Sequence, residues 1–345
     1  MRQHDTNWIT QMTGSQFLQI MKCFTGESLR QAVASHLFPL LLFYSAMIIT
    51  LAATVRFSNI PEASSYEIAQ RAPVEEAARI GPEELEKSGI PLIQGEIRLL
   101  FGAVKIPWVK FRENAVRYFE SMLVFFTSDA VGLIFALIWT AGFIPEFLQG
   151  FWWNMLRLRP LSTGFMLLGK TFSIVIVLSL HGIILIGGTW IALGIATNIW
   201  NGLFLWSFAI LVVQFICFYP ASVFLGTWSR STMVAIIGSI AFWAICWMVN
   251  HARISNLSAT TSESSSGVAI WLIEIAYWAL PKPIDFSIIL SDLMGTIKEF
   301  PPPTSWMNAW ETGNIIPFAS IGTSLISSVI VLWFSCMELK NPVKE

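Results

Sequence analysis

Six long apolar stretches restrict what this chain can fold into more than any other feature. They cover residues 36–57, 119–144, 172–194, 203–228, 233–250 and 315–337. A helix rises about 1.5 Å per residue, so about 20 apolar residues cross the roughly 30 Å hydrocarbon layer of a bilayer. The stretches lack the in-and-out alternation of a membrane β-barrel. The sequence therefore predicts an all-α integral membrane protein with about six transmembrane helices.

The composition agrees with a membrane protein. Charged residues are 12% of the chain and hydrophobic residues 54%, whereas soluble domains carry roughly 25% charged residues. The formal net charge is -1 and no run of five basic residues occurs, so no nucleic-acid partner is expected. The four cysteines lack C-x-x-C spacing and predict neither a metal site nor a disulfide framework.

Lysine and arginine in the short connections set the expected orientation. Six spans put both termini on one side, together with the connections that carry Arg157 and Arg230, whereas the connection near residues 197–202 has no basic residue. Because positive charge gathers on the cytoplasmic side, we expect a multi-pass protein of the plasma (inner) membrane. Residues 1–35 and 338–345 would be the cytoplasmic N-terminal segment and tail.

Two long connections, residues 58–118 and 251–314, fall on the outer side in this topology. The first ends in the amphipathic run GEIRLLFGAVKIPWVKF, which would form a small lid or lie along the interface. The second opens with SNLSATTSESSSG, a flexible linker by composition, and then reaches an apolar helix at 268–280 that is too short to cross. The proline after this helix predicts a re-entrant hairpin, with a surface helix as the alternative. Glu274 within it would need water or a partner.

The inner segment, residues 145–171, connects the second and third spans. Pro145 and Glu146 suit a first helical turn and Pro160 suits a stop, so a short amphipathic helix is predicted. By their spacing, Phe147, Phe151 and Met155 form the apolar face of this helix. Trp153 would point away from that face.

The stretch GFMLLGKT, residues 164–171, matches the phosphate-loop pattern G-x-x-x-x-G-K-[ST]. A working phosphate loop follows a buried strand and opens a soluble helix. The sequence TFSIVIVLSLHGIILIGG that follows here belongs in a bilayer, so no ATP site is expected. Lys170 is predicted to lie at the inner mouth of the third span with its ammonium at the headgroups. Gly164 and Gly169 would permit a turn and close helix approach.

The run TAGFIPEFLQGFWWNMLRLRPLSTGFMLLGK resembles the stretch between the second and third spans of type-2 permeases of ATP-binding-cassette transporters. It is similar above all to the branch of copper-enzyme maturation permeases. The branch pattern L-L-x-[RK]-P-[LV]-[SP]-R-x-x-[LM]-L-x-G-K matches residues 156–170, except that Thr163 stands where arginine is usual. The stretches GGTWIALG, SRST and YWALPKPIDF resemble the same branch. The likeness runs from about residue 95 onward.

This resemblance implies a permease subunit that moves an unknown substrate across or out of the membrane. It would have no catalytic residue or cofactor of its own, because ATP and magnesium would bind a separate cytoplasmic ATPase. An inner coupling helix, an outer re-entrant hairpin and a second permease copy or paralogue are implied too. The alternatives are a passive membrane scaffold or channel, and an intramembrane enzyme. The expected ATPase contacts are Glu146, Phe151, Trp152, Arg157 and Arg159.

Two ionisable residues lie deep in predicted spans, Asp129 in the second and His181 in the third. Such groups are costly in hydrocarbon and usually face the bundle interior or water. Their similar depth makes a contact between them possible. We interpret both, with Glu274, as possible lining of a translocation path. The alternative is a buried hydrogen-bonded pair that only fixes the bundle.

Overall fold

The computed structural model describes residues 14–59, 95–108, 112–150, 153, 155, 162–258, 267–297 and 300–339. Over these residues the chain is an all-α multi-span membrane protein with one small sheet, which confirms the predicted fold class. Five helical segments are long and apolar enough to cross a membrane, and a sixth is present if one bent pair counts as a single span. The five are Val116–Gln149, Thr163–Thr197, Gly202–Ser229, Thr232–Leu257 and Pro317–Glu338.

The bent pair consists of α2 (Gly14–Ala34) and α3 (Phe38–Thr54), which meet at an angle of 81°. A proline in the first turn of α3 suits a helix start, because no intrahelical N–H is required there. α3 corresponds to the first predicted span. It ends at Thr54, after which the chain enters strand β1 (Arg56–Asn59). The sequence predicted a cytoplasmic segment at residues 1–35 and did not predict the helix α2.

The second span is built from three helices in series rather than one. These are α7 (Arg112–Thr127), α8 (Ala130–Thr140) and α9 (Phe143–Gln149). A Cβ atom on Gly132 would lie 2.2 Å from the carbonyl oxygen of Thr127, so the close approach of the backbone at the first break requires glycine. The span predicted at residues 119–144 lies within the apolar helical segment Val116–Gln149, and the structure adds breaks at residues 128–129 and 141–142.

Helix α12 (Trp206–Ser229) occupies the middle of the bundle. It packs against α8, α11 (Thr163–Thr197), α13 (Thr232–Ser258) and α17 (Pro317–Glu338). The span that α12 forms with the short η2 (Gly202–Leu205) has 61% of its most apolar part buried inside the molecule. The same share for the α13 span is 17%. α13 exposes several apolar side chains, among them Met233, Ile237 and Met248, as a helix surrounded by lipid does.

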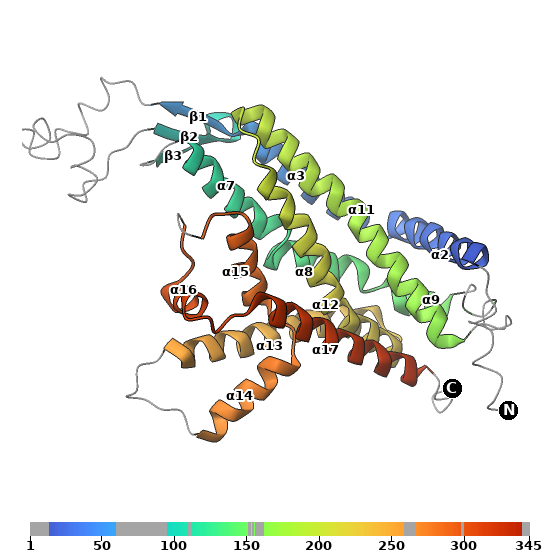
Figure 1. The fold of residues 1–345 in the computed structure, drawn as a ribbon. Helices are drawn as coiled ribbons and strands as arrows, with labels where there is room; N and C mark the ends of the chain where they lie inside the picture. The colour runs from blue at the N-terminus through green and yellow to red at the C-terminus, as the bar shows by residue number, and fades with distance from the viewer. Residues whose placement is uncertain are drawn as a thin grey trace, which may run out of the picture.

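A three-stranded antiparallel sheet lies at one end of the bundle (Figure 1). β2 (Gly95–Leu99) pairs with β1 on one side and with β3 (Val104–Trp108) on the other. The turn η1 (Leu100–Gly102) joins β2 to β3. The predicted lid or interfacial segment thus contains a hairpin, and its place relative to the membrane stays a prediction. The alternation of apolar and charged residues in GEIRL was the signal for it.

The region between α13 and α17 contains α14 (Gly267–Ala279), α15 (Pro283–Leu293) and α16 (Thr304–Glu311). α14 confirms the predicted short helix to within one residue at each end. The connection predicted from residue 251 starts later, because α13 continues to Ser258. The first four residues of the predicted linker SNLSATTSESSSG are therefore helical, and residues 259–266 lie outside the described residues. α14 packs on α13 and α17, and α15 follows it and is buried against α12, α13 and α17. The re-entrant hairpin expected from the sequence stays a prediction.

The two ends of the bundle differ in what they carry (Figure 1). The sheet end holds the three strands and the last turn of α11, where Arg56 donates to the carbonyl of Ala196 at 3.1 Å. The opposite end, which we call the α9 end, holds α2, α9, the start of α11 and the end of α17. Gly164 of α11 faces Cys336 of α17 there.

Candidate functional site

Asp129 lies at the break between α7 and α8, not in the middle of a helix. Both of its carboxylate oxygens are within hydrogen-bond distance of the Ser287 hydroxyl of α15, at 2.7 and 2.8 Å. His181 of α11 instead has its Nε2 atom 3.3 Å from the Ser45 hydroxyl of α3. Within the described residues no hydrogen bond joins Asp129 to His181, so the contact that their similar depth allowed is not formed. Sequence position gives the depth of a side chain but not the direction in which it points.

Glu274 of α14 has the partner that the sequence required. Arg253 of α13 donates to it at 2.9 Å, and the indole N–H of Trp278 donates at 3.0 Å. Burial raises the pKa of Glu274, but the hydrogen bonds from Arg253 and Trp278 and the charge of Arg253 outweigh this and lower its pKa overall. The Arg253 guanidinium also lies 3.9 Å from the centre of the Tyr277 ring. Glu274 therefore fastens α14 to α13.

A buried carboxylate, Asp285, lies in the first turn of α15 next to this ion pair. It accepts hydrogen bonds from the Asn250 amide at 3.0 Å, from the Tyr277 hydroxyl at 2.6 Å, and from the hydroxyl of Ser320. The first turn of a helix favours a negative charge. The same Asn250 side chain accepts the backbone N–H of Ile284 at 2.9 Å. α13, α14, α15 and α17 therefore share one polar centre, which we call the hairpin cluster.

Lys282 completes the hairpin cluster. Its ammonium donates to the Thr323 hydroxyl of α17 at 2.6 Å and lies 4.7 Å from the centre of the Tyr277 ring. The side chain is fully buried, and burial lowers the pKa of Lys282 to about 8. Sequence reasoning singled out the neighbouring Glu274 but no member of this cluster. The polar letters that interrupt the apolar run in YWALPKPIDF were the available signal.

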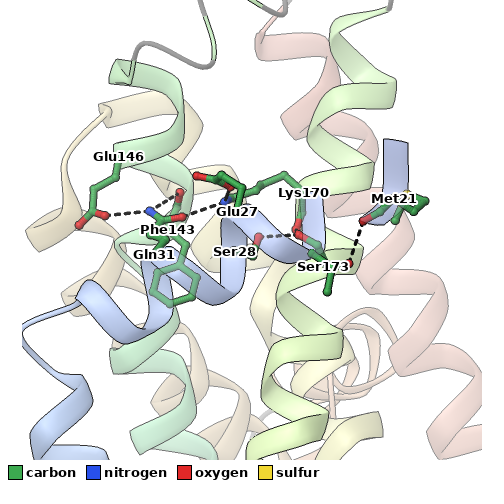
Figure 2. A network of polar contacts seen from close by, with 9 residues as sticks. Met21, Glu27, Ser28, Gln31, Phe143, Glu146, Lys170 and Ser173 are labelled. Atoms are coloured by element: carbon green, nitrogen blue, oxygen red, sulfur yellow. Dashed lines mark hydrogen bonds and ion pairs between the residues drawn. The ribbon is translucent and has the colours of Figure 1, made fainter. Parts of the chain in front are cut away.

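A second polar network joins three helices at the α9 end (Figure 2). The ammonium of Lys170 on α11 forms an ion pair with Glu27 of α2 and donates to the Gln31 side chain at 2.8 Å. Ser28 of α2 and Ser173 of α11 share a hydrogen bond of 2.6 Å. We call this set the α2 clamp. Its members are Glu27, Ser28, Gln31, Glu146, Lys170 and Ser173.

Gln31 is the point at which the α2 clamp reaches α9. Its amide nitrogen donates to the Glu146 carboxylate at 2.8 Å and to the Phe143 carbonyl at 3.2 Å, while its oxygen accepts from Lys170. A flipped amide would place two donors against the ammonium, so the partners fix this orientation. One side chain of α2 thereby connects α9 to α11.

The phosphate-loop pattern lies entirely inside a helix. Residues 164–171 belong to α11, whose N-cap Ser162 accepts the backbone N–H of Phe165 at 3.2 Å. Backbone N–H groups committed to a helix cannot surround a phosphate, and the turn expected at Gly164 and Gly169 is wrong. Close approach at Gly169 is right, because a Cβ there would lie 3.1 Å from the Phe24 ring of α2.

The headgroup position predicted for Lys170 is also wrong. The side chain is 0% exposed, and its ammonium lies 5.2 Å from the centre of the Phe147 ring. The sequence pattern placed this lysine at a helix end beside lipid, where snorkelling is the usual outcome. Here α2 covers that position and supplies Glu27 as a counter-charge. Because Glu27 is 143 residues away in the chain, no local pattern could reveal the pair.

The segment expected to contact an ATPase is described only in part. Glu146 is exposed in the first turn of α9, whereas Phe151, Trp152, Arg157 and Arg159 lie outside the described residues. α9 ends at Gln149 because Gly150 is extended. Of the predicted apolar face, Phe147 is buried, Met155 is exposed and Phe151 lies outside the described residues. The direction predicted for Trp153 is wrong, because its ring packs on Phe147 with centroids 5.6 Å apart.

The described residues contain no group of three or more His, Cys, Asp or Glu side chains that could hold a metal ion. No family model, curated protein or solved structure matches the chain. The resemblance to type-2 permeases therefore rests on the sequence pattern.

Proposed function

We propose that this chain is the membrane-spanning permease subunit of an ATP-binding-cassette transporter. A separate cytoplasmic ATPase, which binds ATP and magnesium, would drive the movement of a substrate across or out of the membrane. The functional unit would contain a second permease copy or a paralogue. The α9 end would face the cytoplasm at the plasma membrane.

The observation that carries this proposal is the convergence of four helices, α2, α11, α12 and α13, on α9. Gln31 of α2 binds Glu146, and the side-chain amide of Gln149 donates to the Arg230 carbonyl between α12 and α13. A Cβ on Gly226 of α12 would lie 3.0 Å from Pro145, so these two helices touch closely. α11 contacts α9 through Lys170 and Phe147.

Such packing suits a helix that transmits motion. Packed interfaces switch between discrete arrangements rather than deform continuously, so a push on α9 would move its neighbours as rigid bodies. The exposed Glu146 would meet the ATPase, together with Phe151, Trp152, Arg157 and Arg159 on the following segment. Asp129 at the broken second span and the hairpin cluster near Glu274 would then lie beside the moving helices, and His181 would take part as a contact between α3 and α11.

The alternatives have less support. An intramembrane enzyme needs a nucleophile, a base or metal ligands that converge on one point. Asp129 and His181, the two ionisable residues singled out in the spans, hydrogen-bond to different serines on different helices. A passive scaffold or channel would give no reason for a short helix that four others contact.

The test is co-purification of an ATPase with the solubilised protein from its native membrane. The Arg157→Glu, Arg159→Glu double variant should release the ATPase and abolish the associated ATP hydrolysis. Lys105→Glu, a charge reversal on β3 at the sheet end, should retain both. Failure to recover an ATPase with the unmodified protein in several mild detergents would refute the proposal and favour the scaffold or channel.

A further inference from the structure

Helix α2 has a second face, turned away from α11, that no described residue covers. The exposed side chains on it include Leu18, Leu29 and Val33, which are 61%, 46% and 55% exposed. They are spaced by 11 and 4 residues, so they lie on one side of the helix. The other two exposed residues that matter here are basic, Lys22 and Arg30.

The charge on this face is of one sign. Glu27 is the one acidic residue of α2, and it pairs with Lys170 on the opposite side of the helix. From residue 18 onward, where side chains are described, the outward face therefore has two cations and no anion. Neither Lys22 nor Arg30 has an ion pair within the described residues. A surface that combines leucine, valine and unpaired cations complements an anionic lipid surface.

The position of α2 fits the level of the lipid headgroups. Only residues 35–37 separate it from α3, and the two helices meet at 81°. Leu40 and Phe43, in the first two turns of α3, are 51% and 68% exposed, as lipid-facing side chains of a span are. If α3 runs along the bilayer normal, α2 must lie nearly in the plane of the membrane, within about one helical turn of the hydrocarbon boundary.

We propose that the outward face of α2 binds anionic phospholipids at the membrane surface. Leu18, Leu29 and Val33 enter the boundary between headgroups and acyl chains, while Lys22 and Arg30 contact the headgroup phosphates. The inward face stays on α11 through the α2 clamp. The same helix therefore connects lipid composition to α9 through Gln31. The proposal depends on the spans, not on the identity of any ATPase.

The experiment uses the full-length protein in bilayers of phosphatidylcholine with and without phosphatidylglycerol. Replacing Cys23 and Cys336 by serine leaves the buried Cys217 and Cys246 as the remaining cysteines, and Leu29→Cys then provides a label site. A spin label at position 29 should collide more with oxygen, which concentrates in lipid, than with a water-soluble nickel chelate. A label on the native Cys23, which points about 120° away from position 29 around the helix, should show the reverse.

Anionic preference is measured with a dye at position 29 and brominated lipids. Brominated phosphatidylglycerol should quench more than brominated phosphatidylcholine at equal mole fraction, with a local enrichment of about fivefold for each basic residue. Lys22→Gln with Arg30→Gln should abolish the difference, and Lys105→Gln at the sheet end should preserve it. Equal quenching by both lipids overturns the proposal. A label at position 29 that collides freely with the water-soluble nickel chelate also overturns the proposal. A label shielded from both oxygen and nickel overturns it too, because it indicates that a protein partner covers this face.

Discussion

Replacing Glu27 by alanine should release α2 from the bundle. The change leaves the Lys170 ammonium buried without its counter-charge, and Lys170 is 0% exposed while Glu27 is 25% exposed. Removal of one partner from a buried ion pair costs about 3–5 kcal/mol. We take about 3 kcal/mol, because water already screens part of Glu27 and Gln31 still accepts a hydrogen bond from the ammonium. This is roughly a 150-fold increase in the equilibrium for opening, since 1.4 kcal/mol is tenfold.

Hydrogen exchange of the α2 amides in the full-length protein measures this opening directly. Lys170→Met should cost less, about 1 kcal/mol, because Glu27 can turn to solvent and the buried site then holds an apolar group. The double variant Glu27→Ala, Lys170→Met should recover about 2 kcal/mol relative to the sum of the single changes, within the usual range for contacting residues. Additive costs, or unchanged exchange in Glu27→Ala, would show that the ion pair does not hold α2.

Three further outcomes are expected. Gly169→Ala should loosen α2 by about 1–3 kcal/mol in the same exchange assay, because the added methyl group meets the Phe24 ring. The control Gly187→Ala has open space around the new methyl group and should be neutral or stabilising by up to about 1 kcal/mol. The pKa of Glu274 is lowered, so its ion pair stabilises α14 at pH values above the ordinary carboxyl pKa of 4.5, and this stabilisation is lost as the pH falls below it. Glu274→Gln should therefore speed hydrogen exchange of the α14 amides at pH 7 and remove the dependence on acid pH. The pKa of Lys282 is lowered from 10.5 to about 8, so between these pH values the unfolded chain binds more protons than the folded chain, and the stability of the fold should rise with pH. Thermal unfolding measured across this window should show the rise, and Lys282→Met should remove it. An unchanged rise in the variant would contradict the assignment.

Features that depend on neighbouring residues could be predicted from the sequence. The positions of the spans and of α14 follow from apolar length, since the hydrocarbon layer imposes a fixed requirement on any chain that crosses it. The requirement that Glu274 find a partner followed from its place in an apolar helix, and Arg253 meets it. The sheet at GEIRL also had a local signal, the alternation with period two.

Breaks and directions could not be predicted in this way. An apolar stretch has the same composition whether it forms one helix or three, so the break at Asp129 depends on the backbone contact that Gly132 permits. The depths of Asp129 and His181 were similar, yet α15 and α3 supply their partners. Rotation of each helix about its axis is set by packing, which spacing along one segment does not encode.

By itself, the sequence determined that the chain is helical, that it crosses a membrane several times and that a short helix precedes the last span, because these properties follow from local hydropathy and helix geometry. Only the tertiary structure decided that Lys170 is buried against Glu27, that α2 is a helix clamped to α9 and α11, and that Lys282 and Asp285 join four helices. The physical reason is that a buried charge is stable only beside a partner, and the partner is chosen by the packing of helices that lie far apart in the chain.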